Sequence, residues 1–381
     1  MQQPAKSHHQ TSFTDLPPAV LWRLIKQDQS GALASVCRDM RVVRHSAAMA
    51  ANPPWGNQIH SLDGLAKFTA LESIDMHRID MHGDLSVLSS MTRLRTLNCN
   101  QAGFEDLGPL SCLTSLESLD CSWNNIKDIK ALAGLTALKH LHCDFLISLT
   151  DNILTSLSAL SLLQTFSCRC SFYGSSKISD ISPLSSLSSL HKLDCTTTAI
   201  NDLTPLSSLL SLRTLICSNS PISDLSPLAS LSALHKLDCR STTTNDLTPL
   251  SNLPSLRTLI CSFTPVNDLS PLASLSSLHK LDCSSTTIND LTPLSSLLSL
   301  RTLICSSTPI NDLSPLASLS SLNVLNISKC HSISSLSTLS SLSSLDALVC
   351  KYCKELDHEE VRDLYRKLKD QIKLYYEPFD Q

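Results

Sequence analysis

The sequence predicts an α/β repeat solenoid, a horseshoe of about 13 repeats with a parallel β-sheet on its concave face, a helical N-terminal segment and a C-terminal capping helix. Three observations predict it. Cysteines recur at a fixed spacing, leucines alternate with polar residues just before them, and a Ser-Pro or Thr-Pro pair follows most of them.

The spacing of the cysteines sets the length of one repeat. Six of them are each 22 residues apart: Cys195, Cys217, Cys239, Cys261, Cys283 and Cys305. A fixed period of this length is the signature of a solenoid, in which each coil buries its apolar side chains against its neighbours. We assign residues 51–356 to the solenoid.

Each repeat divides into a strand and a turn. In residues 278–299, LHKLDCSSTTINDLTPLSSLLS, Leu281 and Cys283 alternate with polar residues, as in a short strand with one buried face. The Thr-Pro pair predicts a short helical turn, with the hydroxyl residue at the N-cap and proline at the first helical position. Leu294 and Leu297 would point inward from this turn. The alternative, that these pairs are phosphorylation sites, explains their strict recurrence less well.

This pattern resembles the 22-residue class of leucine-rich repeats found in bacterial internalins and in a phosphatase regulatory subunit. Residues 278–288 fit L-x-x-L-x-L-x-x-N-x-L, and residues 288–294 fit the more specific I-x-D-L-x-P-L. The class has Asn at an inward turn position. Here Asn124 stands there once and hydroxyl residues such as Thr286 replace it elsewhere, so we expect a similar but weaker local bond.

Residues 357–377 are predicted to form a helix that caps the last repeat. Asp357 and Glu360 have the spacing of a capping box. Apolar residues then recur at helical spacing: Val361, Leu364, Tyr365, Leu368 and Ile372. A solenoid needs such a cap because its last repeat otherwise exposes its core.

The N-terminus lies outside the repeats. We expect residues 1–12 to be disordered and residues 13–50 to form short helices, which would simply shield the first repeat. The alternative is that this segment resembles an F-box, although Met40 stands where that family has Trp. The residues that match the F-box are Leu16, Pro17, Val20, Leu21, Ile25, Leu33, Ser35, Val36, Cys37 and Arg38.

The F-box resemblance implies a partner. F-box helices dock on the Skp-type adaptor of a cullin ubiquitin ligase, and the attached repeats capture a substrate. The residues to which the resemblance assigns adaptor binding are Leu16, Pro17, Val20, Leu21, Ile25, Leu33, Val36 and Cys37. The repeats joined to F-boxes are usually a longer class, which only residues 345–361 resemble here.

Composition and charge exclude several classes of protein. The formal charge is −4, and Lys and Arg are scattered along the sequence, so no basic stripe for nucleic acid is visible. No apolar run approaches the roughly 18–20 residues that span a bilayer, and MQQPAKSHHQ lacks the apolar stretch of a secretion signal. We therefore expect a cytoplasmic protein, or alternatively a nuclear one, whose 16 cysteines are mostly buried thiols without disulfides.

Nothing in the sequence predicts an enzyme, a metal or a cofactor. His191, His235 and His279 are copies of one repeat position and do not converge. No G-x-S-x-G, H-E-x-x-H or phosphate-binding glycine loop is present, and the sequences CKYC and CRC have no second pair at zinc-site spacing.

The concave face is the best candidate for a binding surface. Its strands alternate HKLDC with RTLIC, so two repeats form one 44-residue duplication. The residues beside each buried leucine would contact a protein partner, and Lys and Asp of one strand are close enough to pair. These candidates are Lys192, Asp194, Ile216, Lys236, Asp238, Ile260, Lys280, Asp282 and Ile304. The alternative is a solvated face that was copied by duplication.

The sequence thus predicts a protein-binding scaffold. Its most specific form is an F-box-type substrate-recognition adaptor of a cullin ubiquitin ligase. The alternative is a general leucine-rich-repeat interaction protein, phosphatase-regulator-like or adhesion-type, without a ubiquitin link.

Overall fold

The computed structural model describes residues 71–78, 85–146, 150–171, 178–368 and 373–376. They form two compact bodies, divided between residues 176 and 177, which we call the N-terminal body and the C-terminal body. The predicted F-box-like segment and the expected disordered start, residues 1–50, lie outside the described residues.

The N-terminal body is a parallel sheet backed by short helices. Its strands pair in chain order and in register: β1 (Ser73–Asp75), β2 (Thr96–Asn98), β3 (Ser118–Asp120), β4 (His140–His142) and β5 (Thr165–Ser167). The helices between them are the 3-10 turns η4 (Ser86–Ser90), η5 (Gly108–Cys112), η6 (Lys130–Gly134) and η7 (Thr155–Ala159), and the short α4 (Asp151–Leu154).

The C-terminal body repeats the same arrangement. Its parallel strands are β6 (Lys192–Asp194), β7 (Thr214–Ile216), β8 (Lys236–Asp238), β9 (Thr258–Ile260), β10 (Lys280–Asp282), β11 (Thr302–Ile304), β12 (Val324–Asn326), β13 (Ala347–Val349) and β14 (Lys373–Tyr375). Its helices are η8 (Ser182–Ser186), η9 (Thr204–Leu206), η10 (Ser226–Leu228), η11 (Thr248–Leu250), η12 (Ser270–Leu272), η13 (Thr292–Ser296), η14 (Ser314–Ser318), η15 (Ser337–Ser341) and α5 (His358–Leu368).

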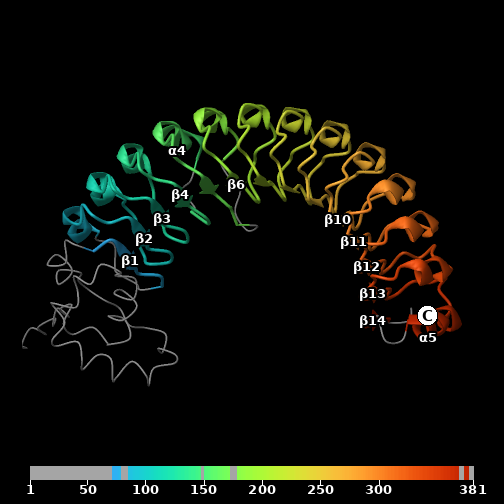
Figure 1. Ribbon diagram of the computed structural model, residues 1–381. Helices are drawn as coiled ribbons and strands as arrows, with labels where there is room; N and C mark the ends of the chain where they lie inside the picture. Colours follow the sequence, from blue (N-terminus) through green and yellow to red (C-terminus); the bar gives the residue numbers. More distant parts are fainter. Residues whose placement is uncertain (1–70, 79–84, 147–149, 172–177, 369–372, 377–381) are drawn as a thin grey trace, which may run out of the picture. The chain divides into compact units, whose positions relative to one another are not determined.

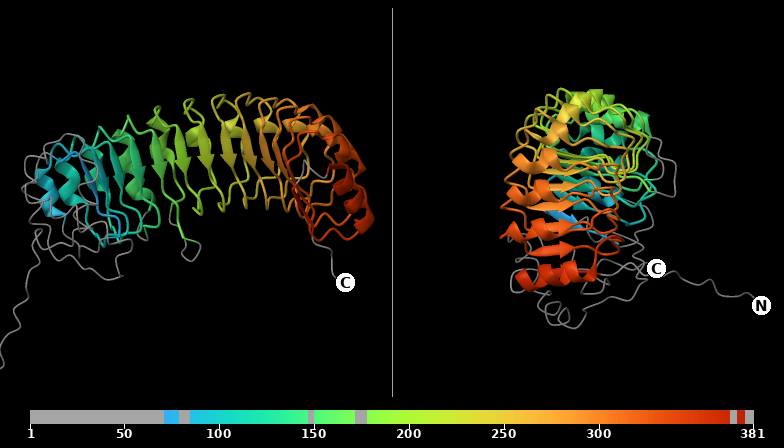
Figure 2. Two further views of the ribbon diagram at one scale, coloured as in Figure 1. Left: turned by 60° about the horizontal axis from the view of Figure 1, so that its bottom comes forward. Right: turned by 90° about the vertical axis from the view of Figure 1, so that its right-hand side faces the viewer.

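The predicted solenoid is confirmed. Within each body the strands lie side by side along the inner side and the one-turn helices along the outer side (Figures 1 and 2). The core lies between these two layers. In residues 278–299 the inward side chains are at most 1% exposed: Leu278, Leu281, Cys283, Ile288, Leu291, Leu294 and Leu297. At about 1.5–3 kcal/mol for each fully buried aliphatic side chain, this burial is the dominant stabilising term in each repeat.

The one-turn helices begin differently from the prediction, which placed the hydroxyl residue at the N-cap. In η13 the N-cap is Leu291, and Thr292 is already the first helical residue. The cap is Asp290, whose Oδ1 accepts the backbone N–H of Thr292 at 2.7 Å. A carboxylate two residues ahead of the helix reaches this N–H, as in an Asx turn. The same bond joins Asp180–Ser182, Asp202–Thr204, Asp224–Ser226, Asp246–Thr248, Asp268–Ser270 and Asp312–Ser314.

The C-terminal cap also differs in detail. Val361 and Leu364 of α5 are buried, but Glu360 does not complete a capping box. Its Oε1 instead accepts the backbone N–H of Leu336 at 2.8 Å and so ties α5 to the start of η15. The helix ends at Leu368, and the chain then adds β14 to the sheet. The predicted helix is therefore shorter than its apolar periodicity indicated. The residues of β14 form a strand instead, because a strand there pairs with the backbone groups along the edge of β13.

Candidate functional site

Among the described strands, all but β5 and β14 are followed by a non-glycine residue in the left-handed backbone region. Twelve non-glycine residues have φ between 53° and 61°: Arg78, Gln101, Trp123, Phe145, Thr197, Asn219, Ser241, Phe263, Ser285, Ser307, Lys329 and Tyr352. Residues other than glycine raise the conformational energy of the backbone when they occupy this region, because the Cβ atom is crowded there. The turn sends several of them to the surface, where Trp123 is 54% and Phe263 is 63% exposed.

The inward turn position behaves as its residue type predicts. The side chain of Asn124 accepts the N–H groups of Ala102 and Phe104, both at 3.0 Å, and donates to the carbonyl oxygen of Cys99 at 2.7 Å. It therefore bridges neighbouring repeats. Thr286 donates one bond, to the carbonyl oxygen of Cys283 within its own turn, at 2.7 Å. The threonines at this position make the local bond that we expected, whereas Ser220 reaches the preceding repeat, where its hydroxyl accepts the N–H of Thr198 at 3.2 Å and donates to the carbonyl oxygen of Cys195 at 3.4 Å.

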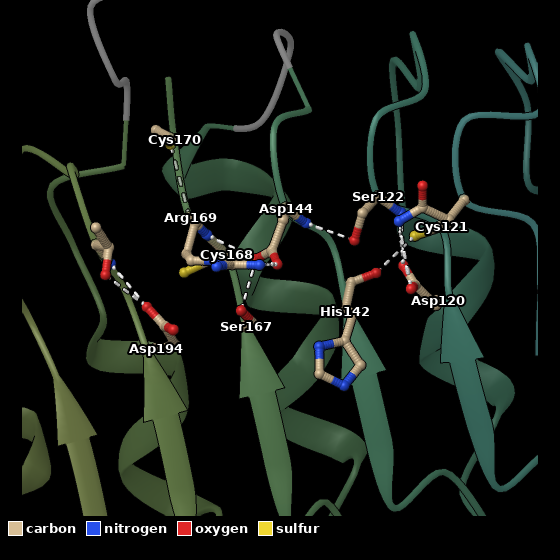
Figure 3. Close-up of polar contacts among 12 residues, drawn as sticks. Asp120, Cys121, Ser122, His142, Asp144, Ser167, Cys168, Arg169, Cys170 and Asp194 are labelled. Carbon is tan, nitrogen blue, oxygen red and sulfur yellow. Dashed lines mark hydrogen bonds and ion pairs between the residues drawn. The ribbon is translucent and has the colours of Figure 1, made fainter. Parts of the chain in front are cut away.

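A buried carboxylate organises a polar cluster in the N-terminal body (Figure 3). Oδ1 of Asp144 accepts the hydroxyl of Ser167 at 2.6 Å and the backbone N–H of Arg169 at 2.9 Å. Oδ2 accepts both Nε and Nη2 of the Arg169 guanidinium, at 2.9 and 2.7 Å. The Asp144 side chain is only 4% exposed, whereas that of Arg169 is 45% exposed. The carboxylate therefore holds the guanidinium in place at the surface.

Arg169 in turn lies over an aromatic pair that the sequence analysis missed. Its guanidinium carbon is 5.6 Å from the centre of the Phe145 ring. That ring stacks on Trp123, with the two ring centres 4.1 Å apart. Trp123 and Phe145 both stand two residues after a repeat cysteine, and this shared position was the available signal. The three side chains form a fixed, partly exposed surface at the end of strands β3–β5.

The cysteines of the described residues form no disulfide, as predicted. Those at the repeat position are fully buried, and burial raises the pKa of several of them, such as Cys217 and Cys283; for Cys239 the pKa rises to about 12. The sulfur atoms of Cys121 and Cys143 lie 3.6 Å apart without a bond. Cys112 is exposed and lies on η5, away from the repeat position. The buried thiols are core side chains and carry no chemistry in the folded state.

The predicted candidates on the concave face do fall into columns. Lys192, Thr214, Lys236, Thr258, Lys280 and Thr302 are partners across successive strands, and so are Asp194, Ile216, Asp238, Ile260, Asp282 and Ile304. Their exposure is uneven. Asp194, Asp238 and Ile260 are buried, whereas Ile216, Ile304 and the three lysines are half-buried.

The predicted pairing of Lys with Asp on one strand was wrong. Asp238 binds the guanidinium of Arg240, and Asp282 accepts the N–H and the hydroxyl of Ser284 at 3.1 and 2.7 Å. Residues two apart on a strand are about 6.6 Å from each other. The donors of the following turn are closer, so each carboxylate turns away from the lysine.

The part of the chain that the structure describes contains neither a metal-binding cluster nor a helix that could span a membrane. No cluster of three or more His, Cys, Asp or Glu side chains there has the arrangement of a metal site. In the same residues, every helix is too short or too polar to cross a lipid bilayer.

A comparison of the sequence with models of known protein families agrees with the repeat geometry. The model described as "Leucine Rich repeats (2 copies)" matches residues 254–296, which hold β9, β10 and the turns after them. This is a leucine-rich-repeat protein. No curated protein matches the leucine-rich-repeat chain in sequence.

Solved structures extend the likeness over most of this leucine-rich-repeat protein. An internalin of Listeria monocytogenes, InlF, is 27% identical over 81% of this chain and 88% of its own, with a TM-score of 0.70. A leucine-rich-repeat protein of Leptospira interrogans is 16% identical over 83% of this chain and 86% of its own, with a TM-score of 0.69. The functional domain of InlJ from Listeria monocytogenes is 24% identical over 82% of this chain and 64% of its own, with a TM-score of 0.64.

Proposed function

We propose that the protein is a non-catalytic scaffold that binds another protein on the strand face of β6–β11. The observation that carries this proposal is the register of these strands, which stacks Lys alternating with Thr, and Asp alternating with Ile, into two columns on a continuous face. The face offers half-buried threonine, lysine and isoleucine side chains, which suit contact with a protein surface. The likeness in fold to internalins supports a role in interaction.

A steric block on this face tests the proposal. Thr214, Thr258 and Thr302 lie on alternate strands, 44 residues apart, and are half-buried. We would replace all three with Tyr and compare the proteins that co-purify with the wild type and with the variant. The matched control carries Tyr at Ser232, Ser276 and Ser320, which have the same spacing but are exposed in the turns before the strands.

The expected result is that specific partners are lost with the threonine variant and kept with the serine variant. A purified partner is then titrated against each protein by calorimetry. If both variants retain the same partners with the same affinity, the strand face is not the binding surface. Circular dichroism of both variants checks that the repeats are still folded.

The narrower adaptor role remains a proposal on the N-terminal sequence alone. It rests on the F-box-like residues Leu16, Pro17 and Val36 and their neighbours. A purified pull-down with the Skp-type adaptor, beside a Leu21→Asp, Val36→Asp variant, decides it: binding that this variant loses supports the role, and absence of binding removes it. We likewise propose a reducing compartment such as the cytoplasm, since the repeat-position thiols of the described residues are not cross-linked.

A further inference from the structure

A line of cations runs along the entry side of strands β6–β11 in the C-terminal body. Each strand from β6 to β11 contributes one, either a lysine within the strand or an arginine directly before it. In chain order they are Lys192, Arg213, Lys236, Arg257, Lys280 and Arg301, and we call them the cation line. Neighbouring strands are about 4.8 Å apart, so the line is about 24 Å long.

These charges are not neutralised within the described part of the protein. None of the six forms an ion pair with a described residue. The nearest acidic residues along the strands, such as Asp238 and Asp282, bond to the turns that follow. Arg213, Arg257 and Arg301 are exposed, so their guanidinium groups are accessible to a ligand.

The capping carboxylates of this body lie at the opposite edge of the coil, while Asp194, Asp238 and Asp282 lie on the strands themselves. The capping carboxylates, such as Asp202 and Asp290, lie between the end of a strand and the next one-turn helix. The cation line lies where the chain re-enters the strand. No glutamate occurs between residues 178 and 354. The capping carboxylates are therefore separated from the cation line, and the carboxylates of Asp194, Asp238 and Asp282 are bonded to donors in the turns after their strands.

Isoleucines accompany the cation line. Ile216, Ile260 and Ile304 share a face with Thr214, Thr258 and Thr302 on the strands that the arginines precede. Proteins that bind single-stranded nucleic acid without sequence preference offer aromatic rings on which bases stack. Apart from the lysines, strands β6–β11 contain threonine, isoleucine, leucine and aspartate instead, and the rings beside the cation line are those of His191, His235 and His279. This composition favours a peptide ligand.

We propose that the cation line binds an extended acidic segment of a partner protein, with its Asp or Glu carboxylates on the Lys and Arg side chains and its apolar residues on the half-buried Ile216 and Ile304. An extended chain rises about 3.3 Å per residue, so about seven residues would cover the line. Complementary charge of this kind also speeds association and selects the partner. This inference rests on the proposed function, because it assigns the chemistry of the ligand to the same face.

The test uses the full chain and a short labelled peptide in which Glu alternates with Leu or Ser. The decisive variant is Arg213→Gln, Arg257→Gln, Arg301→Gln. The matched control, Lys127→Gln, Arg362→Gln, Arg366→Gln, removes the same number of charges from exposed ion pairs elsewhere. Fluorescence anisotropy at low and high salt measures the affinity. A peptide with Gln in place of Glu and a short single-stranded RNA are the comparison ligands.

We expect the arginine variant to bind the acidic peptide about tenfold more weakly or worse, the control variant to bind it like the wild type, and salt to weaken binding. Equal binding by both variants, or no binding of the acidic peptide to the wild type, would overturn the inference. Binding of RNA but not of the peptide would overturn it in favour of a nucleic acid. The Thr→Tyr experiment is independent of these results: partners lost there leave the strand face as the binding surface even if the acidic peptide fails.

Discussion

The side-chain amide of Asn124 donates a hydrogen bond to the carbonyl oxygen of Cys99, 2.7 Å away in the preceding repeat. Together with the N–H groups of Ala102 and Phe104, this bond joins two coils through one buried side chain. Backbone groups that are buried and lose their partner are costly, because water cannot replace it.

Asn124→Thr should therefore destabilise the protein by about 2–3 kcal/mol, since the threonine hydroxyl at this position, as at Thr286, bonds the carbonyl oxygen of its own turn. Chemical denaturation measures the change in the free energy of unfolding. The control is Asn125→Thr, because Asn125 is exposed and should change stability by less than about 0.5 kcal/mol. Equal effects of the two substitutions would contradict the bridging role.

The reciprocal change should act in the other direction. Thr286 occupies the corresponding turn of a later repeat and makes one local bond. Thr286→Asn should raise the free energy of unfolding by about 1 kcal/mol, while Thr286→Val, which removes the hydroxyl, should lower it by a similar amount. The same denaturation curves report both. A loss of stability with Asn would show that the turn has no room for the amide.

The capping aspartates predict a stability that depends on pH. Each of these carboxyl groups accepts hydrogen bonds from the Ser or Thr that follows it by two residues, and these bonds lower its pKa below the ordinary value of 3.8. This holds for Asp180, Asp202, Asp224, Asp246, Asp290 and Asp312. A carboxyl group with a lowered pKa stabilises the folded state above the unfolded pKa and loses this effect as pH falls through the folded pKa. The urea midpoint should thus be constant above about pH 5 and fall in acid.

Replacing Asp202, Asp246 and Asp290 with Asn should flatten that acid limb, because the amide oxygen can still accept the N–H bond but does not titrate. The comparison is the midpoint of unfolding against pH for the variant and the wild type. An unchanged slope in acid would mean that other carboxyl groups control it.

The thiols predict a simple pattern of reactivity. Cys112 is exposed, whereas Cys239 and Cys350 are buried and have pKa values raised by burial to about 12. In a Cys37→Ser, Cys170→Ser background, which also removes the half-buried Cys170, a thiol reagent at neutral pH should label Cys112 quickly and the repeat-position cysteines only at the rate of unfolding. Adding Cys112→Ser should remove the fast phase. Rapid labelling of Cys239 in the folded protein would contradict the buried assignment.

Asp144→Ala should destabilise the N-terminal body by about 2–4 kcal/mol, because it leaves the Ser167 hydroxyl and the Arg169 guanidinium without their buried partner. The control is Glu105→Ala, which breaks an exposed ion pair with Lys127 and should change the free energy of unfolding far less. Denaturation curves measure both. Similar small losses would mean that the cluster in Figure 3 adds little stability.

Periodicity made the core predictable. One repeat position fixes which side of the coil a residue occupies, so the burial of Leu281, Cys283 and Leu294 followed from the spacing alone. The start of each one-turn helix did not follow, because Asp290, Thr292 and the proline after it are all plausible near a helix start. Moving the first residue of the helix by one position changes which of these residues is the cap, and the sequence pattern does not fix the helix start that closely.

The surface was less predictable than the core. The cation line escaped detection because its spacing alternates between 21 and 23 residues, as from Lys192 to Arg213 and on to Lys236. Charges that look scattered in the chain therefore align across strands. The cluster of Trp123, Phe145 and Arg169 was missed because it lies in the turns after the strands, beyond the positions that the concave-face prediction covered.

The 44-residue duplication determines how many cations the cation line contains. Each duplication inserts one HKLDC strand and one RTLIC strand, and with them one lysine and one arginine. The copies are nearly identical, so recombination between them in the gene would add or remove whole pairs of coils without changing a packed side chain. The length of the charged face can thus vary in steps of about 9.6 Å, two strand spacings, through copy number and not through point mutation.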